Sequence, residues 1–150
     1  MQARIDELSA HALFENAARL RDRTVAVATA VRRTQRLAAV AAIEQLVLAR
    51  PTGDGGWELS VIRSGRLASA GLARRGTHPM PVVDAITAAA ETVLPDDAPF
   101  RGASPEELGL IARWLSSDGV RIVSATSGYV EPVSGAGKWE AWCRLARAGT

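Results

Sequence analysis

Trp57-Glu-Leu-Ser-Val-Ile-Arg63 and Arg66-Leu-Ala-Ser-Ala-Gly-Leu72 are two short apolar runs that are separated by Ser64-Gly65. Runs of this length, joined by two residues that include a glycine, are typical of an antiparallel β-hairpin. Just upstream, Pro51-Thr-Gly-Asp-Gly-Gly56 is a cluster of turn residues. The pattern therefore predicts a meander of antiparallel strands.

The short apolar run Gln45-Leu-Val-Leu-Ala-Arg50 lies directly before this turn cluster. We expect it to be the first strand of the meander. Residues 43–49 could equally continue a preceding helix, because a short apolar run does not distinguish a strand from a helix by its period.

Residues 1–44 contain two helical patterns and neither glycine nor proline. Apolar residues recur at steps of three and four in residues 3–12, and a longer pattern of this period runs from Phe14 to about Ala42. Alanine and arginine are strong helix formers. We expect a helical hairpin over residues 1–44, with its turn near residues 11–13, and a small domain over residues 45–150 packed on it as one compact unit.

Further helices and one strand are expected downstream. Pro81 is placed to open a helix that ends near Leu94, and Ser104-Pro-Glu-Glu107 combines a serine cap, a proline at the first position and a glutamate three residues after the cap. Residues 120–124 predict another strand, and residues 138–148 a terminal helix. The fold class is therefore α+β, with an N-terminal helical hairpin and a small antiparallel sheet covered by helices.

The composition is that of an ordinary globular domain. Hydrophobic residues make up 47% of the 150 residues and charged residues 23%, which argues against disorder or a fibrous repeat. The single cysteine, Cys143, excludes an internal disulfide framework and a cysteine-based zinc cluster. The sequence contains no apolar stretch of the ~20 residues that a membrane span needs and no signal-peptide pattern. A reducing, cytoplasmic location is the resulting expectation.

Few residues are placed for catalysis or metal binding. Glu58 is the one strand carboxylate candidate, and we expect it to face solvent beside Trp57. His11 and His78 lack a metal-ligand partner at a suitable spacing. Cys143 is expected to be a small buried side chain. The sequence thus indicates no catalytic residue, no metal and no cofactor in this segment.

Two glycine-rich segments, residues 53–56 and 134–137, invite comparison with phosphate-binding loops. Neither matches a Walker motif, since only Lys138 follows the second segment loosely. Turn formation is the better account of both.

Arginines gather on the expected long helix. At ~100° per residue, Arg19, Arg23 and Arg33 share a polar stripe. Arg36 lies at its edge, and Arg32 joins it only if the helix bends. Such a stripe could contact DNA phosphates without reading bases, although a solvated helix face is the commoner case. The candidate nucleic-acid-binding residues are Arg19, Arg23, Arg32, Arg33 and Arg36.

The segment Phe14-Glu15-Asn-Ala17-Ala18-Arg-Leu20-Arg21-Asp22 resembles the UVR motif. This motif is a helical hairpin shared by the excision-repair subunits UvrB and UvrC and by some Clp-associated proteins. The resemblance covers residues 2–35 and implies that this segment binds a protein partner. The candidate partner-binding residues are Phe14, Glu15, Ala17, Ala18, Leu20, Arg21 and Asp22.

Each of these side chains has an expected role in such a hairpin. Phe14 would anchor the turn, Ala17 and Ala18 would allow the helices to approach closely, and Leu20 would fill the seam between them. Arg21 and Asp22 would form a polar lock or a partner contact.

The rest of the chain looks like the C-terminal region of actinobacterial proteins that fuse a DEDD-type, DnaQ-like exonuclease to a GIY-YIG nuclease module similar to UvrC and Cho. Residues 56–71, 79–86 and 113–123 carry this resemblance. The exonuclease carboxylates and the Gly-Ile-Tyr/Tyr-Ile-Gly signature are absent from the 150 residues. The resemblance implies a non-catalytic module of a DNA-repair nuclease that docks a UvrB-like protein or a second copy and contacts the DNA backbone.

An alternative from another class is an independent small enzyme or ligand-binding protein. Trp57, Trp114, Trp139 and Trp142 could line one stacking pocket beside the sheet, although packing in the core is the commoner use of tryptophan. A deep, polar-lined cavity would favour this alternative.

Overall fold

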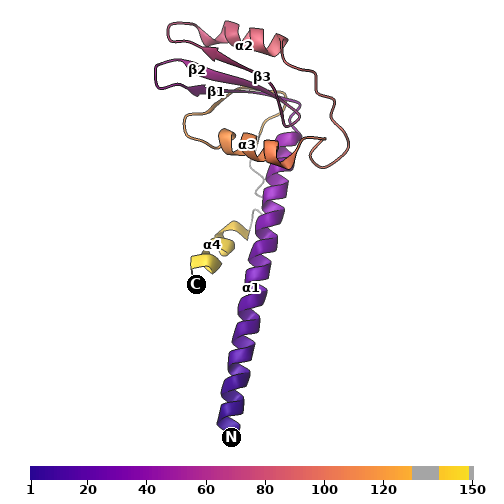
Figure 1. Ribbon diagram of the computed structural model, residues 1–150, viewed down its shortest axis with the longest axis vertical. Helices are drawn as coiled ribbons and strands as arrows, with labels where there is room; N and C mark the ends of the chain where they lie inside the picture. The colour runs from indigo at the N-terminus through magenta and orange to yellow at the C-terminus, as the bar shows by residue number, and fades with distance from the viewer. Residues whose placement is uncertain (130–138, 149–150) are drawn as a thin grey trace. The chain divides into compact units, whose positions relative to one another are not determined.

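The computed structural model describes residues 1–129 and 139–148, which divide between two compact units (Figure 1). One, the sheet unit, comprises residues 35–131, and the other, the helical unit, comprises residues 1–34 and 132–150. The expected α+β class is confirmed, because a four-stranded antiparallel sheet is combined with helices.

The sheet of the sheet unit has the strand order β3-β2-β1-β4. Its strands are β1 (Gln45–Pro51), β2 (Trp57–Arg63), β3 (Arg66–Ala73) and β4 (Arg121–Ala125). All three pairings are antiparallel. The predicted meander is therefore confirmed, and the apolar run after residue 44 is a strand rather than the end of the helix.

The turn between β2 and β3 is the two-residue link that the sequence predicts. Ser64 and Gly65 both have positive φ values, of 46° and 79°. Two such residues make a type I′ turn, whose twist matches that of the strands it joins. A Cβ atom on Gly65 would lie 2.5 Å from Leu108 Cδ2, so this position needs glycine for its space as well as for its backbone.

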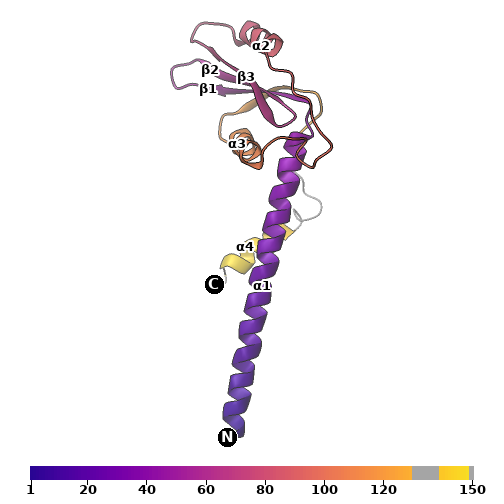
Figure 2. The same ribbon diagram turned by 45° about the vertical axis from the view of Figure 1, so that its right-hand side comes forward.

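Helices α2 (Pro79–Ala88) and α3 (Pro105–Leu115) lie on opposite faces of the sheet (Figures 1 and 2). Successive residues of a strand point to opposite faces, so β1 and β2 each contribute to two cores. The buried core on the α2 side comprises Val47, Ala49, Leu59, Val61, Ala73 and Val83. The buried core on the α3 side includes Leu46, Leu48, Ile62, Leu108, Ile111 and the end of α1, Leu37, Val40 and Ala41.

Helix α2 begins and ends earlier than its pattern predicts. It starts at Pro79 rather than Pro81, because His78 Nδ1 accepts a hydrogen bond from the Met80 amide at 3.3 Å and so acts as the N-cap. It ends at Ala88, and the Arg63 guanidinium then donates to the carbonyl oxygens of Thr87, Ala90 and Glu91. These carbonyls are satisfied by a strand residue instead of a further helical turn.

Helix α3 begins as predicted. The Ser104 hydroxyl accepts a hydrogen bond from the Glu107 amide at 3.1 Å, and Pro105 is the first helical residue. The Glu107 carboxylate does not return to the cap. It accepts a hydrogen bond from the Leu67 amide of β3 at 2.9 Å and thus ties α3 to the sheet.

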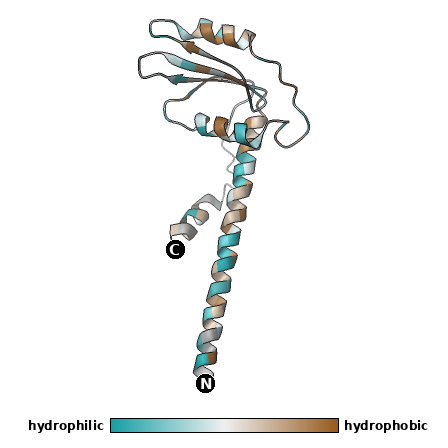
Figure 3. Cartoon of the chain, in the orientation of Figure 1, coloured by the Kyte–Doolittle hydropathy of each residue, from teal (hydrophilic) through white to brown (hydrophobic). Residues whose placement is uncertain are grey.

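The expected helical hairpin is wrong, because α1 is one helix from Gln2 to Ala41. No glycine or proline interrupts this stretch, and its many alanines and arginines favour continued helix. No turn forms at residues 11–13. Helix α1 carries hydrophobic and hydrophilic residues along its whole length (Figure 3).

The helical unit also contains α4 (Glu140–Ala148), which confirms the predicted terminal helix. Trp139 and Trp142 form an edge-to-face pair with ring centroids 6.2 Å apart. Cys143 is buried, as the sequence predicts. Among the helices that the structure describes, none combines the length and the apolar character that crossing a membrane requires.

Candidate functional site

Helix α1 exposes large apolar side chains within the segment singled out by the sequence. Leu13, Phe14 and Leu20 are 71%, 82% and 67% exposed. Since the helix does not fold back on itself, Phe14 anchors no turn and Leu20 fills no seam within this chain. Apolar side chains of this size on one helix are typical of a surface that another molecule covers.

Two of these residues, Leu13 and Leu20, belong to a regular stripe. Leu13, Leu20 and Val27 follow at steps of seven, and positions midway between them also share the helix face. Alternating steps of four and three bring residues to one side of a helix and are the pattern of helix–helix pairing. We name this set the apolar stripe; its members are Leu13, Ala17, Leu20, Thr24, Val27 and Val31.

The C-terminal part of the apolar stripe borders α4 within the helical unit. A groove of about 470 Å³ is lined by Thr24, Val27 and Val31 of α1 and by the two tryptophans of α4. Trp139 and Trp142 are 50% and 38% exposed, so α4 covers this part of the stripe incompletely. Leu13 and Leu20, at 71% and 67%, are more exposed than Val27 and Val31, at 63% and 44%.

The other predicted partner-binding residues flank the stripe. Arg21 and Asp22 do form an ion pair, with Nε and Oδ1 3.3 Å apart, and Glu15 pairs with Arg19 at 3.5 Å. Ala18 is half-buried. Exposed pairs of this kind contribute little to stability.

The predicted nucleic-acid-binding arginines fall into two groups. Arg19, Arg23 and Arg33 are exposed. Arg32 is half-buried and has an interaction of its own within the chain. Arg36 donates hydrogen bonds to the Ala112 carbonyl oxygen and the Ser116 hydroxyl, both near the end of α3. Arg36 therefore has a structural role in the sheet unit, which sequence spacing could not indicate because its partners lie 76 and 80 residues away.

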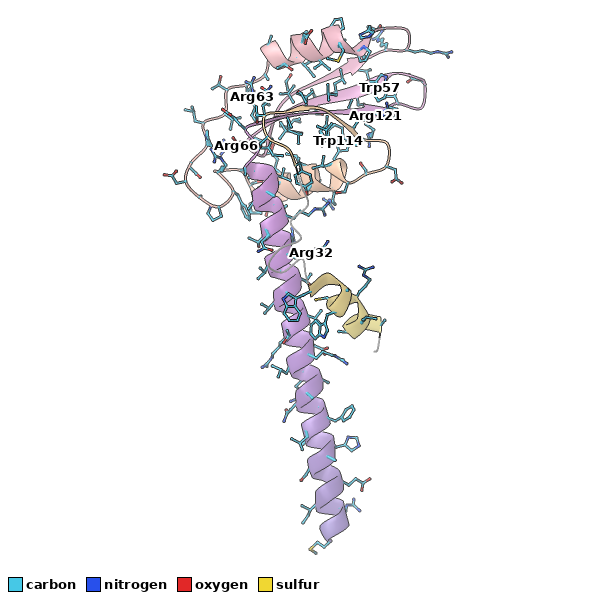
Figure 4. All side chains as sticks on the ribbon, turned by 180° about the vertical axis from the view of Figure 1, so that it is seen from behind. Arg32, Trp57, Arg63, Arg66, Trp114 and Arg121 are labelled. Carbon is cyan, nitrogen blue, oxygen red and sulfur yellow. The ribbon has the colours of Figure 1, made fainter. Side chains whose placement is uncertain are left out.

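The tryptophans do not line one common pocket in the sheet unit. Trp57 packs against the α2-side core and Trp114 against the α3-side core, on opposite faces of the sheet (Figure 4). The Arg121 guanidinium lies 5.4 Å from the Trp57 ring centroid, and that of Arg50 lies 5.9 Å from the Trp114 centroid. At these distances both arginines make cation–π contacts.

The strand carboxylate Glu58 has a structural partner. Its side chain is 45% exposed, so it faces solvent as expected, although on the face of the sheet opposite Trp57. It accepts hydrogen bonds from Arg50 Nε and Nη2 at 3.0 and 2.5 Å. Over residues 1–129 and 139–148, no three histidine, cysteine or acidic side chains gather as a metal site would require.

The glycine-rich loop at residues 53–56 is a turn. The Asp54 carboxylate accepts hydrogen bonds from the Thr52 hydroxyl and from the Gly56 amide, the latter at 3.2 Å. These two bonds lower the pKa of Asp54 below its ordinary value of 3.8. The Gly56 amide thus already donates its hydrogen bond to a carboxylate of the chain. A phosphate bound in this loop would need that same donor. The second such segment, residues 134–137, lies outside the described residues.

Comparison with known proteins finds a similar protein whose name describes a nuclease. The sequence is 48% identical over 149 residues to a protein of Mycobacterium tuberculosis (strain CDC 1551 / Oshkosh) that is named a bifunctional exonuclease/endonuclease. The match covers 96% of this chain but only 23% of that relative. No family model matches the sequence. No solved structure matches it either.

Proposed function

We propose that this chain is a non-catalytic docking module of a DNA-repair nuclease and that it associates through the apolar stripe of α1. The observation that carries the proposal is the exposure of Leu13 and Leu20, at 71% and 67%, on a continuous helix. The nuclease context is supported by the relative named an exonuclease/endonuclease, of which this chain matches a minor part.

The use of the carboxylates supports a role without catalysis. A hydrolytic site needs acidic or basic side chains that converge on a substrate. In the sheet unit Glu58 binds Arg50, Glu107 binds the Leu67 amide, and Asp54 closes a turn. Nuclease chemistry would then belong to other parts of a longer protein, as in the exonuclease and GIY-YIG fusions that the sequence resembles.

A second copy of the chain is the first partner to test, and a UvrB-like repair protein is the next. The apolar stripe suits a second copy because alternating steps of four and three pack against the same pattern on another helix. Small residues at Ala17 and Thr24 would allow close approach of the two backbones. Arg23 flanks the stripe with a positive charge, so association of two copies should strengthen as salt screens the repulsion between their Arg23 side chains.

Sedimentation of the 150-residue chain tests this association. We expect concentration-dependent dimers, or a complex with a UvrB-like protein, that Leu20→Glu abolishes. Ala26→Glu, an exposed change on another side of α1, should leave association intact. Monomers at all concentrations, together with no complex, would contradict the docking role.

DNA contact is the second part of the proposed function and rests on Arg19, Arg23 and Arg33. Binding of labelled duplex and single-stranded DNA is measured across a salt series. Replacing all three with alanine should lower the slope of log K against log salt by about 2 to 3, because each lost phosphate contact removes roughly 0.9 for duplex DNA. Replacing the exposed pair Arg74 and Arg75 is the matched control. An unchanged slope would remove these arginines from the DNA contact.

A further inference from the structure

The α3 side of the sheet unit has a pocket that the proposed docking role does not use. It has a volume of about 370 Å³ and lies between β2, β3 and α3. Its apolar walls come from Ile62, Leu67, Leu110, Ile111 and Trp114. A cleft of this size falls in the range of ligand pockets in proteins, which is ~300 to 1,000 Å³.

Ser60 is a buried polar residue that lines this pocket. It lies on the central strand β2 and is only 8% exposed. Among the residues that the structure describes, none makes a hydrogen bond with its hydroxyl group. The Ser60 oxygen is not among the buried side-chain atoms that lack a partner, so within the pocket the hydroxyl is open to water. A polar group at the inner end of a ligand could replace that water and form a hydrogen bond with Ser60.

The mouth of the pocket continues as an apolar surface. Leu67 and Leu110, which line it, are 51% and 59% exposed. Leu72 is 55% exposed, and its pairing with Glu58 places it on the same face of the sheet as Ser60. A ligand that fills the pocket and also covers these leucines must extend beyond the group that it inserts.

Charge at the pocket disfavours a nucleotide. The Glu107 carboxylate is one of the lining groups, and the nearby Arg50 is held by Glu58. A fixed negative charge without a free arginine beside it repels phosphate. An uncharged apolar occupant suits these surroundings better, and a polypeptide segment provides both an inserted side chain and flanking apolar residues.

We propose that this pocket receives a tyrosine side chain from a protein segment that lies over Leu67, Leu72 and Leu110. Tyrosine has an apolar ring for the walls and a hydroxyl for Ser60, and such side chains are frequent anchors of protein interfaces. Trp114 supplies an aromatic wall from α3 (Figure 4). This site is separate from the apolar stripe, so its test is independent of the docking role of α1.

The test titrates the 150-residue chain with capped Val-Tyr-Val and Val-Phe-Val peptides and follows methyl NMR signals of Ile62 and Ile111. We expect the tyrosine peptide to bind about three- to tenfold more tightly than the phenylalanine peptide, which is the effect of one hydrogen bond. Ser60→Ala should remove this difference and leave the phenylalanine peptide unchanged. Equal affinities in the original chain would overturn the role of Ser60.

Two surface variants control for the case in which a pocket variant loses its fold. Leu110→Glu at the mouth should weaken both peptides by at least tenfold, whereas Leu94→Glu, a change at an 82% exposed leucine that does not line the pocket, should not. Amide NMR spectra of both variants report whether the fold is kept. Unchanged peptide affinity in the Leu110→Glu variant would show that the peptides bind elsewhere and would overturn the proposed site.

Two small probes separate the possible sources of the ligand. p-Cresol, the side chain of tyrosine alone, should bind more weakly than the tyrosine peptide, because it leaves the three leucines uncovered. Equal affinity of p-cresol and the peptide would overturn the polypeptide part of the proposal. Thymidine should not shift the methyl signals, and its binding in preference to p-cresol would instead assign the pocket to a nucleobase.

Discussion

The sheet unit and the helical unit use their side chains in opposite ways. In the sheet unit, leucines such as Leu46, Leu48 and Leu108 are fully buried, and long polar side chains such as Arg63 bond to other elements. In the helical unit, Leu13 and Leu20 of α1 are mostly exposed. Burial of apolar surface is the main stabilising term in folding. The sheet unit thus has its own core, whereas α1 still has apolar surface to bury.

Matched leucine truncations give the largest expected contrast between the two units. Leu108→Ala leaves a cavity at a fully buried position and should lower the free energy of unfolding by about 3 to 5 kcal/mol. Leu20→Ala, at a 67% exposed position, should change it by less than about 0.5 kcal/mol at low protein concentration. Urea unfolding measures both. A large loss for Leu20→Ala in the monomer would show that α1 is already packed.

Arginine truncations extend the contrast to polar groups. Arg63→Ala removes the hydrogen bonds to Thr87, Ala90 and Glu91 and should cost about 2 kcal/mol. Arg33→Ala, at an exposed position of α1, should stay within about 0.5 kcal/mol. Thermal unfolding of the two variants provides the comparison. Equal effects would mean that the hydrogen bonds of Arg63 add nothing to the stability of the sheet unit.

The smallest expected effect concerns pH and the turn between β1 and β2. The Thr52 hydroxyl and the Gly56 amide lower the pKa of Asp54 in the folded state. A carboxyl group with a lowered pKa stabilises the fold above its unfolded pKa, and this contribution is lost as the pH falls through the folded pKa. Asp54→Asn should therefore flatten the fall in stability below about pH 4. Urea midpoints measured from pH 6 to pH 3 test this, and identical profiles would contradict it.

Local signals in the sequence predicted much of the sheet unit. Ser64-Gly65 fixes the β2–β3 turn through backbone conformation alone, and Ser104 with Pro105 fixes the start of α3. Both signals act within a few residues, so they are visible without the fold. The early end of α2 is not visible in this way, because it is accompanied by hydrogen bonds from Arg63, which lies 24 to 28 residues earlier in the sequence.

The helical hairpin is a part of the fold that the sequence predicted wrongly. Two helical patterns that meet near residues 11–13 suggested a turn, but no glycine or proline lies there to interrupt the helix. Phe14 and Leu20 are exposed, and the contacts expected of them within a hairpin do not form.

The candidate sites differ in how far the sequence could indicate them. The apolar stripe lies within one helix, so its spacing is readable from residue numbers once the helix is known to be continuous. Ser60 of β2 and Trp114 of α3 line the same pocket, and no local sequence pattern in either segment predicts that they do. The role of Arg36 likewise depends on α3 packing beside the last turns of α1.

The order of the strands also bears on how the sheet assembles. β1, β2 and β3 are consecutive in sequence and are joined by short turns, whereas β4 pairs with β1 across about 70 intervening residues. Closing so long a loop costs more conformational entropy than closing the short turns between β1, β2 and β3. The meander can therefore form early and quickly, and β4 joins its edge late. This strand has no fully buried residue, so it is also the strand from which the folded sheet would open first.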